Sequence, residues 1–187
     1  METEIYFITG NRSKFKEAEL LLAKADVKLL QQDIELSEKK SLSQDEIVIE
    51  KAKEAYEKLK KPVLVDDTGI YFDEYGNFPG TYTKHLFKSI GFKGVERLLA
   101  GANRNAHFRC LVCYNDGKTL KVFEGVWKGK IVDEVSKRFN PDWQYDSIFV
   151  PEGFGRPLSE IPLDERAKSS HRKRAMEGFI SFLGVRK

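Results

Sequence analysis

The sequence predicts an α/β protein, because strand-like and helix-like segments alternate along the whole chain. Residues 5–8 form a short run of strand-forming residues, and residues 13–24 carry apolar side chains at helical spacing. A second strand is expected over residues 27–30. Because no internal repeat, low-complexity tract or long linker divides the 187 residues, we expect one domain or two closely joined lobes.

The clearest helix is expected over residues 43–60. Ser43 followed three residues later by Glu46 is a capping-box pattern, and apolar residues from Val48 to Leu59 repeat at the spacing of a buried stripe. Pro62 then ends the helix. Residues 63–65 are all apolar, which predicts a strand in the middle of the sheet.

The second half of the chain predicts a hairpin and a terminal helix. A turn-rich loop at residues 75–80 precedes one or two short helices within 81–100. Asn115-Asp116-Gly117 is a strong turn signal between strands at 106–114 and 119–127. Residues 129–132 should add a strand, 138–157 should be irregular, and 170–183 should form the last helix.

Cys110 and Cys113 should point to opposite faces of a strand as buried thiols.

Composition excludes several classes of protein. The net charge is +3, from 32 basic and 29 acidic residues, so the chain lacks the dense positive charge of a typical nucleic-acid-binding module. No stretch approaches the roughly 20 apolar residues that a membrane helix needs. The N-terminus shows no secretory signal pattern. We therefore expect a cytoplasmic protein that binds neither nucleic acid nor membranes.

Two segments could hold a phosphate chain and its metal. Thr9-Gly10-Asn11-Arg12-Ser13-Lys14 lies between a strand and a helix, where free N–H groups can bind an anion, although the Walker spacing is missing. Asp66-Asp67-Thr68-Gly69 follows the apolar strand, and two adjacent carboxylates repel each other unless a proton or a cation such as Mg²⁺ lies between them. A plain turn with a surface lysine and an acidic turn are the respective alternatives.

Two further segments could hold a base. His171 and Arg172 follow the capping residue Ser170, and cations are unfavourable at a helix start unless an anion binds there. Trp143-Gln144-Tyr145-Asp146 could stack on a base and accept from its N–H edge. The alternatives are an exposed basic pair and a loop that covers the core. Together, the four segments indicate hydrolysis of a nucleoside triphosphate.

These segments resemble the inosine triphosphate pyrophosphatase family, which removes inosine and xanthosine triphosphates from the nucleotide pool. Thr9-Gly10-Asn11 with Lys14 matches T-G-N-x-x-K, and Asp66-Asp67-Thr68-Gly69 matches [ED]-D-[ST]-G. Residues 78–84 match L-P-G-x-Y-[SI]-K, and Ser170-His171-Arg172 with Ala175 matches S-H-R-x-x-A. The resemblance extends over residues 5–183. It implies one catalytic domain over residues 1–187, a mixed twisted sheet with flanking helices, an elongated two-lobed shape with a central cleft, and a homodimer.

The resemblance also implies residue roles. Glu38 and Asp67 would position Mg²⁺, with Mn²⁺ as a possible substitute. Asp67 would act as base on the attacking water, with help from Asp66, and Lys14 is the third residue implied in catalysis. The residues implied in substrate binding are Thr9, Gly10, Asn11, Arg12, Ser13, Lys14 and Lys51 at the phosphates, Thr68 and Lys84 along the cleft, and Trp143, Gln144, Tyr145, Asp146 and Arg166 around the base. His171 and Arg172 would read the keto oxygen at purine position 6.

The departures from the family pattern cluster on the base side. The family usually has Phe, Gly, Pro and Lys at the places of Trp143, Gln144, Ser147 and Arg166. Only Lys40, where many members carry Gln, lies elsewhere. We therefore predict hydrolysis of the non-standard purine nucleotides ITP, dITP and XTP to the monophosphate and pyrophosphate. The alternatives are a pyrophosphatase for modified pyrimidine or standard nucleotides, and a non-catalytic nucleotide- or nucleic-acid-binding module.

Overall fold

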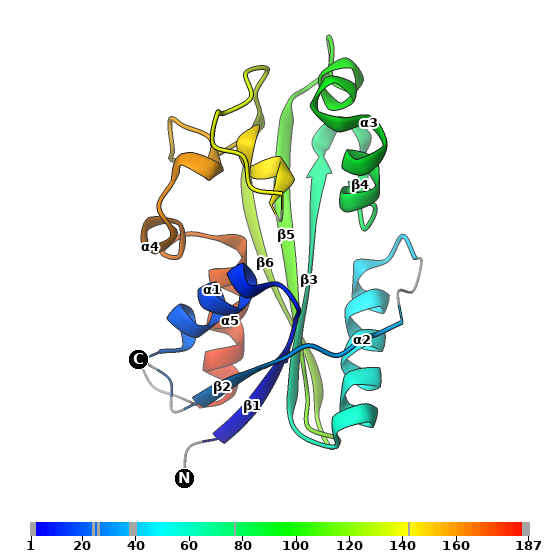
Figure 1. Cartoon of the computed structure of the whole chain (residues 1–187), viewed down its shortest axis with the longest axis vertical. Helices are drawn as coiled ribbons and strands as arrows, with labels where there is room; N and C mark the ends of the chain where they lie inside the picture. Colours follow the sequence, from blue (N-terminus) through cyan, green and yellow to red (C-terminus); the bar gives the residue numbers. More distant parts are fainter. Residues whose placement is uncertain are drawn as a thin grey trace.

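One mixed sheet runs the length of the molecule and carries helices on both faces (Figure 1). The computed structural model describes residues 3–23, 25, 27–37, 41–76, 78–141 and 143–184. In chain order the elements are β1 (Thr3–Ile8), α1 (Arg12–Leu22), β2 (Val27–Gln32), α2 (Gln44–Leu59), β3 (Val63–Phe72), η1 (Asp73–Tyr75), β4 (Pro79–Gly80), α3 (Thr83–Leu98), β5 (Asn105–Asn115), β6 (Leu120–Ile131), η2 (Gln144–Ser147), β7 (Phe149–Pro151), η3 (Leu158–Glu160), α4 (Leu163–Arg166) and α5 (His171–Phe182).

The strand order is β2-β1-β3-β5-β6-β7, with β4 paired to β3. The β1·β2 and β1·β3 pairs are parallel and the remaining pairs are antiparallel, so the predicted mixed sheet is confirmed. β3 lies in the middle, as its apolar start predicts. The strand expected at residues 129–132 is not separate, because β6 continues without a break to Ile131.

The helices divide into layers on opposite faces of the sheet. α1 and α5 cover one face and α2 covers the other (Figure 1). Cys110 belongs to the core under α1 and α5, whereas Cys113 belongs to the core under α2. Both thiols are buried and free, and their places on opposite faces confirm the prediction of two buried thiols on one strand. None of the helices in the described ranges is long and apolar enough to cross a membrane.

β3 is much longer than the sequence suggests, and this places the cleft. The prediction that Asp66 to Gly69 follow the strand is wrong, because β5 pairs with β3 from Val63 to Phe72 and keeps all ten residues extended. On the other edge, β1 pairs only as far as Leu64 and β4 begins to pair at Ile70. Within the described part of the chain, the β3 edge between them has no strand neighbour. This gap in the sheet separates the two lobes.

Gly69 fits the end of this gap because β4 approaches it closely. A Cβ at position 69 would lie 2.6 Å from the Gly80 carbonyl oxygen, which is closer than any side chain tolerates. The glycine of the Asp66–Gly69 segment therefore allows the second lobe to join the sheet immediately beyond the open edge.

Candidate active site

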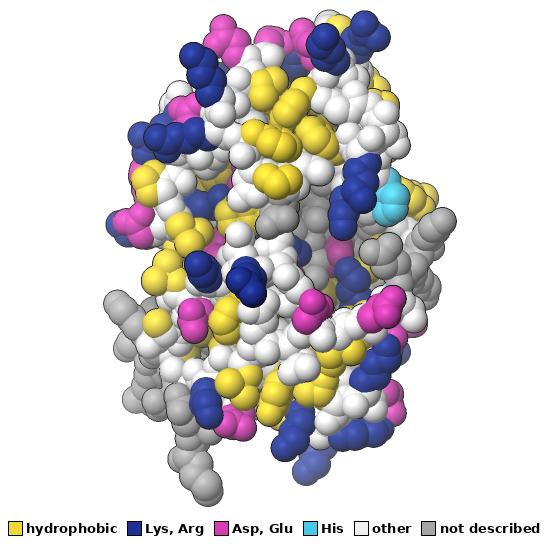
Figure 2. Space-filling model, in the orientation of Figure 1, with side chains coloured by type: hydrophobic (Ala, Val, Ile, Leu, Met, Phe, Trp, Pro, Cys, Tyr) yellow, Lys and Arg dark blue, Asp and Glu magenta, His cyan; other side chains and the backbone are white. Residues whose placement is uncertain are grey.

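A cleft of about 500 Å³ opens at the gap in the sheet, and Figure 2 shows a hollow in this face with basic and acidic side chains inside it. Both lobes contribute to its walls. Predicted site residues that line it are Thr9, Gly10, Asn11, Lys14, Lys51, Asp67, Thr68, Lys84, Trp143, Gln144, Tyr145, Asp146, Arg166, His171 and Arg172. The structure thus brings together segments that are up to 163 residues apart, since 172 minus 9 is 163.

The loop before α1 is held open toward the cleft by its own side chains. Thr9 Oγ1 accepts from the Asn11 N–H at 3.1 Å, and Asn11 Oδ1 caps α1 by accepting from the Lys14 N–H at 3.0 Å. Arg12 and Ser13, also predicted to bind substrate, are not among the residues that line this cleft. Arg12 is exposed, and Ser13 lines a second pocket to which Trp143 also contributes. Four of the six residues in the predicted phosphate-binding segment therefore line the cleft.

The two adjacent carboxylates of β3 point to opposite faces of the sheet, because side chains alternate along a strand. Asp66 faces α1 and α5 and binds Lys14 Nζ at 3.1 Å. Asp67 faces α2 and binds Lys51 Nζ at 2.8 Å. The expectation that one cation lies between the two carboxylates is therefore wrong: each has its own lysine.

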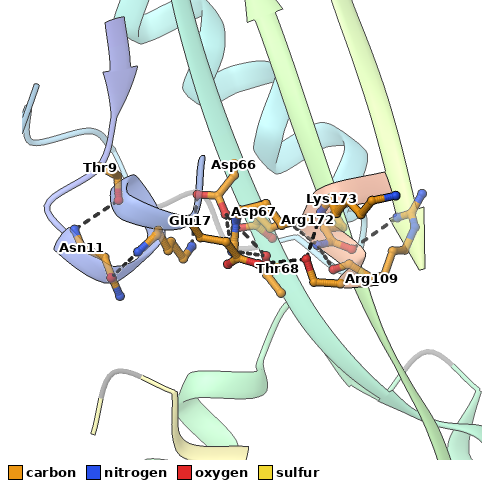
Figure 3. Close-up of polar contacts among 12 residues, drawn as sticks. Thr9, Asn11, Glu17, Asp66, Asp67, Thr68, Arg109, Arg172 and Lys173 are labelled. Carbon is orange, nitrogen blue, oxygen red and sulfur yellow. Dashed lines mark hydrogen bonds and ion pairs between the residues drawn. The ribbon is translucent and has the colours of Figure 1, made fainter. Parts of the chain in front are cut away.

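Asp66, predicted as a catalytic residue, is not among the residues that line the cleft; it belongs to a buried ion network that reaches the cleft through Lys14 and Arg172 (Figure 3). Arg172 Nη2 donates to Asp66 Oδ2 at 2.9 Å, and its Nη1 pairs with Glu17. Glu17 also accepts from Ser170 Oγ at 2.8 Å. Burial alone would raise the pKa of Asp66, yet the charges of Lys14 and Arg172 hold that pKa well below its usual range. Asp66 is therefore a permanent anion with little tendency to accept a proton.

Glu17 is the residue of this network that the sequence analysis missed. It is fully buried on α1 and supplies one of the two carboxylates that neutralise Arg172 at the start of α5. The anion expected beside that helix start is thus provided, at least in part, by the protein itself. The available signal was a carboxylate next to the buried Ala18 on an otherwise apolar helix face.

Asp67 is the carboxylate that a metal could reach. Its side chain is 17% exposed in the cleft, and hard oxygen donors of this kind suit Mg²⁺. The other predicted ligand, Glu38, lies outside the described residues, as does Lys40. Within the described ranges, no group of three or more His, Cys, Asp or Glu side chains could hold a metal alone. The donor set therefore fits a cation held by one or two carboxylates together with substrate phosphates.

The base side contains three of the predicted residues in direct contact. Arg166 Nη1 binds Asp146 Oδ2 at 2.9 Å, and the guanidinium carbon lies 3.9 Å from the centroid of the Trp143 ring. Burial raises the pKa of Asp146 to about 6 despite the opposing charge of Arg166. Two departures from the family pattern, Trp143 and Arg166, thus form one cation–π pair. Asp146 fixes the guanidinium over the indole face.

The other base-side residues differ in their freedom to contact a ligand. Tyr145 is 2% exposed and its ring packs edge-on against Phe72 and Phe87, so it belongs mainly to the hydrophobic core that these rings share. Gln144 does not have the positive φ that a glycine there would permit. His171 stacks on Phe108, and its Nδ1 has no hydrogen-bond partner among the described residues.

The protonation state of His171 follows from its surroundings. Burial, with the neighbouring positive charges of Arg172 and Arg166, holds the pKa of His171 well below its usual range. The imidazole is therefore neutral near pH 7, and one of its nitrogens can donate a hydrogen bond while the other accepts. A neutral donor in a buried pocket is suited to recognise a carbonyl oxygen.

Comparisons with known proteins agree with this geometry. The model of the Ham1 family matches residues 5–182. The chain is 36% identical over 181 residues to the dITP/XTP pyrophosphatase of Saccharolobus solfataricus, covering 96% of this chain and 93% of that protein. It is 36% identical over 190 residues to the inosine triphosphate pyrophosphatase of Candida glabrata, covering 97% of each.

Solved structures show the same fold. The Staphylococcus aureus Ham1 protein superposes with a TM-score of 0.81 at 22% identity, over 97% of this chain and 98% of that one. The HAM1 protein of Coxiella burnetii superposes with a TM-score of 0.79 at 26% identity, also over 97% and 98%. The resemblance drawn from the four motifs is thereby confirmed, as is the mixed α/β fold. The chain belongs to the Ham1 family.

Proposed function

We propose that this protein hydrolyses non-standard purine nucleoside triphosphates, namely ITP, dITP and XTP, to the monophosphate and pyrophosphate. One observation carries the proposal: a single cleft has a carboxylate with two lysines at one end and an aromatic, arginine-lined pocket at the other. We further propose that residues 1–187 act as one catalytic unit, because each lobe supplies only part of this cleft.

Water attack at the α-phosphorus requires a base, and the two aspartates differ in their suitability. Asp66 has both oxygens engaged by Lys14 and Arg172, and its pKa lies well below the usual range. Asp67 has one oxygen on Lys51 and is partly exposed to the cleft. Asp67 therefore takes the proton of the attacking water, and Asp66 fixes the positive charge of Lys14 beside the phosphates.

The phosphate chain would be held by the two cleft lysines and the loop before α1. Lys14, Lys51 and the N–H groups at the start of α1 place positive charge where the leaving pyrophosphate develops negative charge. Mg²⁺, for which Mn²⁺ is a substitute, would be held by Asp67 and would neutralise phosphate charge. Glu38 is the second metal ligand in this proposal.

Base selection would rest on donors placed around purine position 6. The neutral His171 and the Arg166 guanidinium can each donate a hydrogen bond to a 6-keto oxygen. The 6-amino group of adenine is itself a donor, so these protein donors would stay unpaired and adenine would be disfavoured. Arg172 is already bound to Glu17 and Asp66, so we assign it to the floor of the cleft and not to direct reading of the base.

The proposal is tested by measuring pyrophosphate release from inosine, xanthosine, guanosine and adenosine triphosphates and from standard and modified pyrimidine nucleoside triphosphates, each with and without Mg²⁺. Turnover of ITP and XTP that depends on the metal and exceeds that of ATP is expected. Equal rates on standard or modified pyrimidine nucleotides would favour the alternative pyrophosphatase. Binding of single-stranded nucleic acid without any turnover would favour the non-catalytic module. Light scattering of the purified protein tests the expected homodimer.

Trp143→Ala should weaken substrate binding more than it slows chemistry. The indole offers a stacking face to the base and a platform for Arg166, so its loss should raise KM for ITP about tenfold, the scale of about 1–3 kcal/mol of base stacking. The measurement is KM and kcat at saturating Mg²⁺, with Trp143→Phe as control because it keeps a smaller ring. An unchanged KM with reduced kcat would contradict the stacking role.

A further inference from the structure

Gln44, the first residue of α2, has a buried amide in which every polar atom is bonded. Only 1% of the surface of Gln44 is exposed to solvent. Nε2 donates to the Asp67 carbonyl at 3.0 Å and to the Arg109 carbonyl at 3.2 Å. Oε1 accepts from Tyr71 Oη at 2.9 Å and from Arg109 Nη1 at 3.4 Å. A buried amide with four partners is held in one position and orientation.

The chemistry of these partners fixes which end of the amide faces which way. The two carbonyl groups can only accept, so they require the NH₂ end. The Arg109 guanidinium can only donate, so it requires the oxygen end. Arg109 is itself held by Asp45 at 3.0 Å and by Glu124 at 2.7 Å. The orientation of Gln44 is thus determined by groups on β3, β5, β6 and α2 together.

Gln44 and Lys51 lie on the same face of α2, because seven residues make nearly two helical turns. Val48, between them on this face, is fully buried against the sheet. Lys51 Nζ binds the Asp67 carboxylate at 2.8 Å, while Gln44 binds the Asp67 carbonyl. One helix face therefore holds Asp67 at two points, through its main chain and through its side chain.

We infer that Gln44 is a positioning residue for the Asp67–Lys51 pair. It fixes the start of α2 on the backbone of Asp67, and this sets where Lys51 reaches the carboxylate two turns later. The inference deepens the proposed function and rests on it, because it assigns no contact with substrate to Gln44. Its loss should therefore affect the chemical step more than substrate binding.

A double-mutant cycle tests this inference. Gln44→Leu should lower kcat for ITP about tenfold with KM changed less than about twofold, because small displacements of reacting groups are costly. In a Lys51→Met background the same substitution should cost almost nothing further, since the geometry it protects is already lost. Lys84 lies on α3, not on the α2 face that carries Gln44 and Lys51. In a Lys84→Met background, Gln44→Leu should therefore again lower kcat about tenfold.

Two further variants separate positioning from folding. Val63→Ala opens a cavity in the core under α2 without removing a polar group, so it should lower the melting temperature and leave kcat within about twofold. Tyr71→Phe keeps the Gln44 amide but removes one bond to it, so it should lower kcat about two- to threefold even if Gln44→Leu does not fold. An equal kcat loss in the Lys51→Met and Lys84→Met backgrounds, or an unchanged kcat in both Gln44→Leu and Tyr71→Phe, would overturn the inference.

A measurement without substrate keeps this result distinct from the proposed function. The nitrogen NMR signal of the Lys51 side chain reports its pairing with Asp67. We expect this signal to move in Gln44→Leu or, to a smaller extent, in Tyr71→Phe, and to stay in place in Val63→Ala. If the wild-type protein hydrolyses none of the nucleotides, the proposed function fails. The positioning role of Gln44 is rejected separately, if the Lys51 signal does not move in Gln44→Leu or Tyr71→Phe.

Discussion

Asp67→Asn is expected to lower kcat for ITP by at least about 10²-fold, which corresponds to about 2.7 kcal/mol of transition-state stabilisation. The amide keeps the shape of the side chain but removes both the negative charge beside Lys51 and the ability to accept a proton from water. Because the backbone contact with Gln44 does not involve the carboxylate, the fold should be retained. Initial rates at saturating ITP and Mg²⁺ measure the effect.

The control for this variant is Asp73→Asn. Asp73 directly follows β3, but its carboxylate binds His107 outside the cleft and is 44% exposed. Its loss should change kcat less than about twofold, since surface ion pairs contribute little. Near wild-type turnover in Asp67→Asn would remove Asp67 from its proposed role as base.

Glu17→Gln is expected to destabilise the fold by about 3–5 kcal/mol, the scale of removing one partner from a buried ion pair. Arg172 is 3% exposed and would keep only Asp66 as its counter-charge, while Lys14 competes for the same carboxylate. The buried network would then hold two positive groups and one negative group. Urea unfolding monitored by circular dichroism measures the loss directly.

Glu19→Gln is the matched control on the same helix. Glu19 is exposed on α1, so the identical chemical change there should alter the unfolding free energy by less than about 0.5 kcal/mol. Equal urea midpoints for the two variants would mean that Glu17 does not neutralise a buried charge. The network would then require another explanation for its place beneath the cleft.

The contiguous motifs could be found from sequence because their chemistry is local. Ser43 caps α2 and Ser170 caps α5 through side chains only three residues from their partners, as predicted. Likewise, the hairpin around Asn115-Asp116-Gly117 follows from turn chemistry within a few residues. Such interactions do not depend on how the lobes are arranged, so the order of side chains along the chain is sufficient to predict them.

The partners of the catalytic groups could not be found in this way. Glu17 and Arg172 are 155 residues apart in sequence, and Gln44 reaches Arg109 across 65 residues. From the sequence alone, the adjacent Asp66 and Asp67 form one acidic site. Only the pairing of β5 along the whole of β3 shows that the two side chains point to opposite faces.

The sequence by itself determined the α/β class, the helix and turn positions, and the residue types available for phosphate, metal and base. The tertiary structure alone decided which lysine neutralises which aspartate, and that Trp143 and Arg166 stack on each other. The physical reason is that charge pairing and burial depend on distance in space. The sheet sets those distances by ending β1 at one point along β3 and starting β4 at another.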